Sequence, residues 1–203
     1  MPNQGWLAAH PPPGRVFPAP SGDDGYTVED WLKIPEVGEQ VELIDGSFVV
    51  SPMPGLDHAC AATRLIRILD EACPDRYEVV SGSVHVGADG LCPDLVIGEA
   101  EAMTTGALML TAAEIACVGE IARRGRRRQQ EVKPSKYAAA GIPVFVRVEL
   151  HGVGAPRAEV FKLGRKGYEP VAEAAAGGML TIDEPFPVSF DPAWLTGPRR
   201  RPG

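Results

Sequence analysis

The sequence has no long hydrophobic run and few cysteines. No apolar segment approaches the roughly 20 residues that a membrane-spanning helix needs, and the N-terminus has no charged segment leading into an apolar signal core. We therefore expect a cytoplasmic protein with no membrane partner. The 4 cysteines form no C-x-x-C pair and show no zinc-finger spacing with histidine, so we expect buried free thiols rather than disulfides or a zinc site.

An excess of positive charge is also lacking. The formal net charge is −7 at pH 7, which disfavours a protein that coats nucleic acid through bulk charge but leaves room for a local basic groove. Four familiar motifs are missing as well: the G-x-S-x-G elbow, the G-x-x-x-x-G-K-[ST] phosphate loop, G-x-G-x-x-G and H-E-x-x-H. Any chemistry must therefore come from another arrangement of residues.

The chain has enough apolar material for one core. It has 203 residues, of which 44% are hydrophobic, and this length argues for a single domain. Residues 1–25 are rich in proline and have no apolar period, which predicts a flexible leader. We expect one domain over residues 26–195 and a solvated basic tail over 196–203.

The sequence of the first half of this domain predicts a short helix, a hairpin and a longer helix. Thr27 is a candidate N-cap for the first helix, and Asp45-Gly46 is a strong hairpin signal between strands at 40–44 and 47–51. Within the hairpin Glu42 alternates away from its apolar neighbours, which on this evidence alone favours an exposed strand charge. Asp57 is a candidate cap for a helix that Pro74 ends.

The rest of the domain predicts mainly strands. Asp89-Gly90 reads as a turn, residues 99–114 as a loop with a short helical turn, and Pro134 fits its helix only in the first turn. Strands are expected at 77–80, 84–86, 93–97, 115–121, 144–150, 158–163, 168–172 and 179–182, with a helix at 129–140. The fold class is therefore α/β, a mixed sheet with an N-terminal hairpin and a C-terminal β-meander.

Two acids and a lysine are candidates for metal-assisted phosphodiester hydrolysis. Asp94 begins one predicted strand and Glu120 lies near the end of another. If these strands are neighbours, the two carboxylates and the carbonyl of Ile121 can hold Mg²⁺ or Mn²⁺. Lys133 would then orient the attacking water. The alternative is that these are ordinary charges at strand ends, as in any chain of this size.

An arginine-rich segment follows the second acid. It is suited to clamping phosphates, because planar guanidinium groups match the anion, or else it is an exposed loop. The candidates for substrate binding are Arg123, Arg124, Arg126 and Arg127. His58, in the first turn of the longer helix, is a further candidate, although a lone histidine more often has no such role.

Several stretches together resemble a known family, the Uma-two putative restriction endonucleases of the PD-(D/E)XK nuclease superfamily. The resemblance covers about residues 26–195, and its most specific parts are the hairpin acid Glu42 and the run from Lys133 to Pro143. It is carried by the stretches Tyr26–Trp31, Val41–Gly46, Ser51–His58, Pro93–Leu95, Glu120–Ile121 and Lys133–Pro143.

The resemblance implies a restriction-endonuclease-like core, magnesium-dependent cleavage of DNA and a homodimer. It implies a site built from Glu42, Asp94, Glu120 and Lys133, with His58 nearby. In this family the lysine of the superfamily has moved from two residues after the glutamate onto the following helix. Ala122 at the first of these positions and Lys133 at the second fit that change. The chain departs from the family pattern at Gly119, at residues 122–125 and at Gln129. A catalytically inactive nucleic-acid-binding or oligomeric module is therefore the alternative, and another phosphate-ester hydrolase ranks lower.

Overall fold

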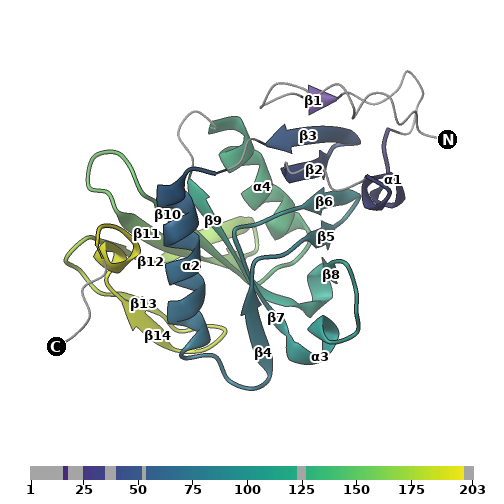
Figure 1. The fold of residues 1–203 in the computed structure, drawn as a ribbon. Coiled ribbons are helices and arrows are strands. Elements are labelled where there is room, and N and C mark those ends of the chain that lie inside the picture. The colour runs from purple at the N-terminus through teal and green to yellow at the C-terminus, as the bar shows by residue number, and fades with distance from the viewer. Residues whose placement is uncertain (1–15, 18–24, 35–39, 52–53, 123–126, 199–203) are drawn as a thin grey trace.

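The structure, a computed structural model, describes residues 16–17, 25–34, 40–51, 54–122 and 127–198, with the backbone alone at 16–17 and 127–131. Over these residues the chain forms two six-stranded sheets, a two-stranded sheet and four α-helices (Figure 1). The predicted mixed α/β fold is confirmed.

The first sheet contains the predicted hairpin. Its strands, in spatial order, are β1 (Val16–Phe17), β3 (Ser47–Ser51), β2 (Gln40–Ile44), β6 (Asp89–Leu91), β5 (Val84–Val86) and β8 (Leu110–Thr111). Asp45 and Gly46 have φ values of 49° and 69°, the positive φ that a two-residue hairpin turn requires. Within the predicted leader, β1 pairs with β3, and the other residues before Gly25 lie outside the described part.

The second sheet carries the C-terminal meander. Its strands, in spatial order, are β12 (Gly167–Ala175), β11 (Arg157–Gly164), β10 (Val144–Glu149), β9 (Ile115–Ala122), β7 (Leu95–Glu99) and β4 (Tyr77–Val80). β9 and β10 are parallel, and the other neighbours are antiparallel. A small third sheet pairs β13 (Leu180–Ile182) with β14 (Val188–Phe190).

Helices cover both faces of the second sheet. The helical elements are α1 (Val28–Leu32), α2 (Leu56–Asp70), α3 (Ala100–Met103), α4 (Arg127–Ala139) and the short 3₁₀ turns Ala112–Glu114 and Pro192–Leu195. Figure 1 shows α2 crossing in front of the second sheet and α4 behind it. No α-helix among the described residues combines the length and the apolar character needed to cross a membrane.

The two faces of the second sheet belong to different hydrophobic cores. On one face Leu65 and Leu69 of α2 pack with Leu95 and Ile121 of the sheet, as expected from apolar residues at three- and four-residue steps along a helix. On the other face Tyr137 of α4 packs with strands of both sheets. The ends of β7 and β9 therefore lie where α2, α4 and the first sheet meet.

Several local predictions are wrong for identifiable reasons. The N-cap of α2 is Gly55 rather than Asp57, whose carboxylate instead lies 2.8 Å from the Nε2 atom of His151. Asp89 and Gly90 belong to β6 rather than to a turn. Pro134 lies inside α4, past the first turn, because the helix begins at Arg127.

The two strands around residues 81–83 lie in different sheets. β4 pairs with β7 in the second sheet, whereas β5 pairs with β6 and β8 in the first sheet. The segment 99–114 forms α3, β8 and a 3₁₀ turn, so the expected loop is more ordered than its composition indicates. Local alternation predicts β4 and β5 as strands but cannot assign them to a sheet.

The cysteines are free, as expected, but they are not all buried. Cys117 is buried in β9, and Cys73 and Cys92 are partly buried. Cys60 is exposed, because α2 turns this position away from the side that carries Ala61 and Leu65. The expectation of a buried thiol is therefore wrong for Cys60.

Candidate active site

Asp94 lies immediately before β7 and reaches the end of β9. Its Oδ2 atom accepts a hydrogen bond of 2.8 Å from the backbone N–H of Ile121. The antiparallel pairing of Leu95 with Gly119 brings these strand ends together. Because Ile121 follows Glu120 directly, the two acids predicted from the sequence come from neighbouring strands and lie side by side along the sheet.

His58 supports Asp94 from the other direction. Its Nε2 atom lies 3.2 Å from Oδ2 of Asp94, and both side chains are nearly buried, at 8% and 10% exposure. His58 shares the buried side of α2 with Ala61 and Leu65, so the helical period directs its ring toward the sheet. The histidine is therefore part of the acid cluster rather than an exposed first-turn residue.

Glu120 faces α4 and accepts two hydrogen bonds on the same oxygen. The Tyr137 hydroxyl donates to Oε1 at 2.7 Å, and the Lys133 ammonium lies 2.6 Å from the same atom. Burial raises the pKa of Glu120, Lys133 opposes this effect, and the negative charges of Asp94 and Glu42 add to it. The resulting pKa is about 7, so the carboxyl gains a proton readily near neutral pH.

Lys133 is the centre of the buried charge network. Its Nζ atom lies 2.6 Å from Glu120 Oε1 and 2.8 Å from Glu42 Oε1, and it donates to the carbonyl of Cys92 at 3.2 Å. Burial by itself lowers the pKa of this lysine, but Glu120 and Glu42 outweigh it and raise the pKa above its ordinary value. The ammonium therefore stays charged, and these three acceptors match its three donors.

Glu42 on β2 is buried, contrary to the exposed strand charge that its alternation favours. It is 3% exposed, and its Oε1 atom also accepts the backbone N–H of Cys92 at 2.9 Å. The alternation predicts correctly that Glu42 and its apolar neighbours face opposite sides, but both faces of β2 are covered. Leu43 packs toward α1, and Val49, directly opposite Glu42 on β3, belongs to the core shared with the second sheet.

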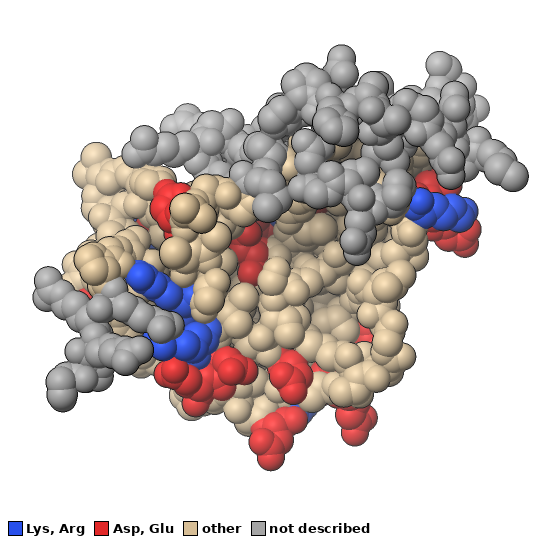
Figure 2. Space-filling model, viewed as in Figure 1, with Lys and Arg blue, Asp and Glu red and all other residues tan. Residues whose placement is uncertain are grey.

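The arginine candidates lie largely outside the described residues. Arg123, Arg124 and Arg126 are not described, and only the backbone of Arg127 is, at the first position of α4. On the face seen in Figure 2, lysine and arginine side chains gather in two separate groups, one over α2 and one beside α1, with acidic side chains between and below them. The described residues of that face form no continuous basic surface.

Two parts of the cluster escape prediction from the sequence. Tyr137 lies four residues after Lys133 on α4, and this spacing places two side chains on the same side of a helix. The spacing was therefore the one sequence signal that could have indicated Tyr137. The backbone of Cys92, which bonds both Glu42 and Lys133, leaves no signal in the sequence. A backbone group of this kind can be found only from the fold.

The donor set suits a hard cation that keeps some of its water. Both hydrogen bonds that Glu120 accepts from described residues end on Oε1, so Oε2 remains available. Among the described residues no three His, Cys, Asp or Glu side chains are placed to hold a metal ion together. Two carboxylates are nevertheless sufficient for magnesium, which usually retains waters and takes substrate phosphate as further ligands. The chain's own residues therefore fit such an ion.

The sheet topology and the acids at its strand ends define a protein with a restriction-endonuclease-like fold. The same fold occurs in the crystal structure of a putative nuclease belonging to DUF820 from Anabaena variabilis, with a TM-score of 0.59 and 16% sequence identity. The likeness covers 71% of this chain and 83% of that chain.

The family assignment is direct. The model of the Uma2 family, described as putative restriction endonuclease, matches residues 28–196. The chain belongs to this family, as the resemblance in its sequence implies. No curated protein matches the chain.

Proposed function

We propose that this protein is a divalent-metal-dependent endonuclease that hydrolyses phosphodiester bonds in DNA. The observation that carries the proposal is the convergence of Asp94 and Glu120 at neighbouring strand ends, with Lys133 bonded to Glu120. Membership of a family described as putative restriction endonucleases supports it. Acids at strand ends with a nearby lysine are the arrangement that metal-assisted hydrolysis requires.

Asp94 and Glu120, with the carbonyl of Ile121, would hold Mg²⁺ or Mn²⁺. A bound divalent cation would lower the pKa of a water molecule and offset the charge that develops on the phosphate. The N–H of Ile121 and the ring of His58 fix Asp94 through Oδ2. Tyr137 and Lys133 fix Glu120 through Oε1, which orients the carboxylate before any ligand binds.

Lys133 has two roles in this proposal. In the described structure it neutralises the buried pair Glu42 and Glu120. Its longest contact, 3.2 Å to the carbonyl of Cys92, is the one that a water molecule would replace most readily, and the ammonium would then orient that water for attack. Glu42 holds the lysine in place and serves as the further acid of the site.

The remaining parts of the proposal concern the substrate and the assembly. His58 positions Asp94, and the segment containing Arg123, Arg124, Arg126 and Arg127 contacts backbone phosphates of DNA. We also infer a cytoplasmic homodimer. Light scattering from the purified protein tests the homodimer, and a monomer mass would reject it.

A catalytically inactive DNA-binding module on the same scaffold is the second candidate. It is favoured by one observation, that the three donors of Lys133 already have three acceptors within the protein. In that case the lysine would be a structural cation and would not release a donor to water. The two candidates predict the same binding of DNA and different outcomes for cleavage.

Plasmid cleavage with magnesium or manganese distinguishes them. We expect the wild type to cleave and Asp70→Ala to match its rate. Asp94→Ala should cleave at least about 100-fold more slowly, which is the usual effect of removing one essential electrostatic contact. Asp70 is a suitable control because it is an exposed acid at the far end of α2. Absence of cleavage by wild type and Asp94→Ala alike, with DNA binding intact, would leave the inactive module.

A further inference from the structure

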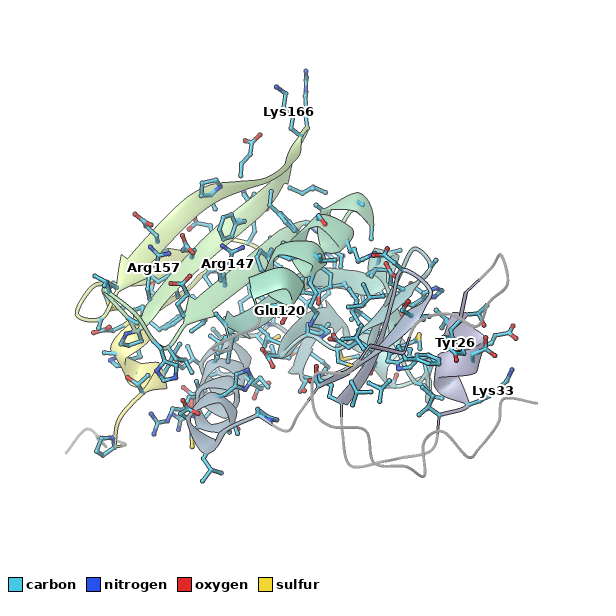
Figure 3. All side chains as sticks on the ribbon, turned by 90° about the horizontal axis from the view of Figure 1, so that it is seen from above. Tyr26, Lys33, Glu120, Arg147, Arg157 and Lys166 are labelled. Atoms are coloured by element: carbon cyan, nitrogen blue, oxygen red, sulfur yellow. The ribbon has the colours of Figure 1, made fainter. Side chains whose placement is uncertain are left out.

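A second arginine, outside the arginine-rich segment, lies one strand away from the acid cluster. The parallel pairing of β9 with β10 places Arg147 opposite Glu120. Paired residues on neighbouring strands direct their side chains to the same face, about 4.8 Å apart along the sheet. Figure 3 labels both residues and shows Arg147 on the strand next to Glu120.

Arg147 is held by aromatic rings rather than by acids. Its guanidinium carbon lies 5.7 Å from the ring centre of Phe145 and 5.3 Å from that of Phe161, and these two rings stack at 5.6 Å. This contact restricts the side chain without using its N–H donors. No described residue forms a hydrogen bond or an ion pair with Arg147, so its donors are available to a ligand.

The aromatic rings connect this arginine to the candidate site. The ring of Phe145 lies 6.3 Å from the ring of Tyr137, and the Tyr137 hydroxyl donates to Glu120. The guanidinium group therefore lies over a ring that packs against the partner of a candidate metal ligand. Arg147 is therefore linked to the candidate metal ligand Glu120 through the side chains of Phe145 and Tyr137.

A neighbouring arginine provides the contrast. Arg157, on β11, lies 3.5 Å from Glu149 and 3.4 Å from Glu159. Glu159 is directly opposite Arg147 across the strands, yet its ion pair is with Arg157. Of these two arginines, Arg157 is paired with acids, whereas Arg147 has no acidic partner among the described residues.

We propose that Arg147 binds a backbone phosphate of the DNA next to the phosphate that is cleaved. The planar guanidinium group can donate two parallel hydrogen bonds to phosphate oxygens, which the ammonium of lysine cannot do. Contacts of this kind fix the register of the duplex and carry no base specificity. This inference rests on the proposed function and assigns a substrate-binding role to a residue of β10.

The test is equilibrium binding of a short fluorescent DNA duplex of mixed sequence, with EDTA present so that no cleavage occurs, over about 50 to 200 mM salt. We expect Arg147→Gln to weaken binding and to reduce the slope of log K against log salt by about 0.9, the contribution of one phosphate. Arg157→Gln should keep the wild-type slope, because its charge is already paired.

The variant Arg147→Lys distinguishes the effect of the positive charge from that of the planar guanidinium group. It should retain the wild-type slope but bind several-fold more weakly, because a point charge replaces a two-pronged donor. If Arg147→Gln or, should that variant fail to fold, Arg147→Lys binds with the affinity and slope of the wild type, the inference is overturned while the proposed nuclease function stands. A change in melting temperature alone would likewise show a purely structural residue. If the wild type binds no duplex, both proposals fail.

Discussion

At the scale of single residues, the candidate site is a small set of buried charges that compensate one another. Lys133 and Glu42 are 7% and 4% exposed at their side chains, and they are in contact at 2.8 Å. A buried charge is costly unless a partner offsets it. The stability of this region therefore depends on the same atoms that we propose for catalysis.

Replacing Lys133 should destabilise the protein severely. Lys133→Met removes the cation and leaves Glu42 and Glu120 uncompensated, which typically costs about 3 to 5 kcal/mol. Urea unfolding measures this free energy. The matched control is Lys162→Met, which breaks an ion pair with Glu184 whose partners are 41% and 57% exposed, and such exposed pairs contribute at most about 1 kcal/mol. Similar losses for both variants would contradict the buried network.

The raised pKa of Glu120 predicts a pH dependence with a definite sign. Its pKa rises from 4.5 to about 7 on folding, so the folded protein binds more protons than the unfolded chain within this window. The contribution of Glu120 to stability is therefore present below pH 4.5 and is lost as the pH rises toward 7. In EDTA, the wild type should lose stability relative to Glu120→Gln over that range. A difference that is independent of pH would refute the shift.

At the scale of elements, a second lysine of α4 fixes the helix to the first sheet. The Nζ atom of Lys136 lies 2.6 Å from Asp45 in the hairpin turn and 2.6 Å from Asp89 of β6. Asp89 in turn accepts the backbone N–H of Asp45 at 2.8 Å. Because Lys133 is on the same helix and Glu42 is in the same hairpin, this contact sets the distance between them.

Lys136→Met should lower both stability and cleavage although it touches no proposed metal ligand. We expect a loss of about 1 to 3 kcal/mol, the usual cost of leaving a buried acid such as Asp89 without its partner. The double variant Lys136→Met with Asp89→Asn should recover part of that loss. Urea unfolding and plasmid cleavage measure the two effects, and wild-type behaviour in both would show that the contact is dispensable.

Much of the element pattern can be predicted from local sequence. Alternation and turn residues locate β2, β3 and the turn at Asp45, and the period of three to four locates α2. What local patterns cannot give is the partner of each strand. The burial of Glu42 depends on a second layer that is distant in sequence, and the helical place of Pro134 depends on where α4 begins.

At the scale of the whole molecule, the acid cluster lies where α2, α4 and both sheets meet. Asp94 and Glu120 are recognisable in the sequence because their types and strand positions suit a metal site. The backbone of Cys92 is not, because its contribution exists only after the sheets pack, and Tyr137 is indicated only by its spacing of four residues from Lys133. The sequence thus indicates the groups that we propose to react better than the groups that hold them.

The rates at which the thiols are alkylated test the packing of the folded molecule. Cys117 is buried in β9, and burial raises the pKa of Cys92 to about 11, so both should resist alkylation at neutral pH. Cys60 is exposed and should react at once. Mass spectrometry after iodoacetamide treatment measures this order, and rapid labelling of Cys117 in the folded protein would contradict the packing of the second sheet.

The most direct test of the central claim is the location of a cation in crystals. Crystals grown with manganese and measured at a wavelength where manganese scatters anomalously would show the ion itself. The account predicts one anomalous peak bridging the carboxylates of Asp94 and Glu120, and no such peak in crystals of Asp94→Ala. Ordered crystals of the wild type with both carboxylates visible and no ion between them would contradict the claim.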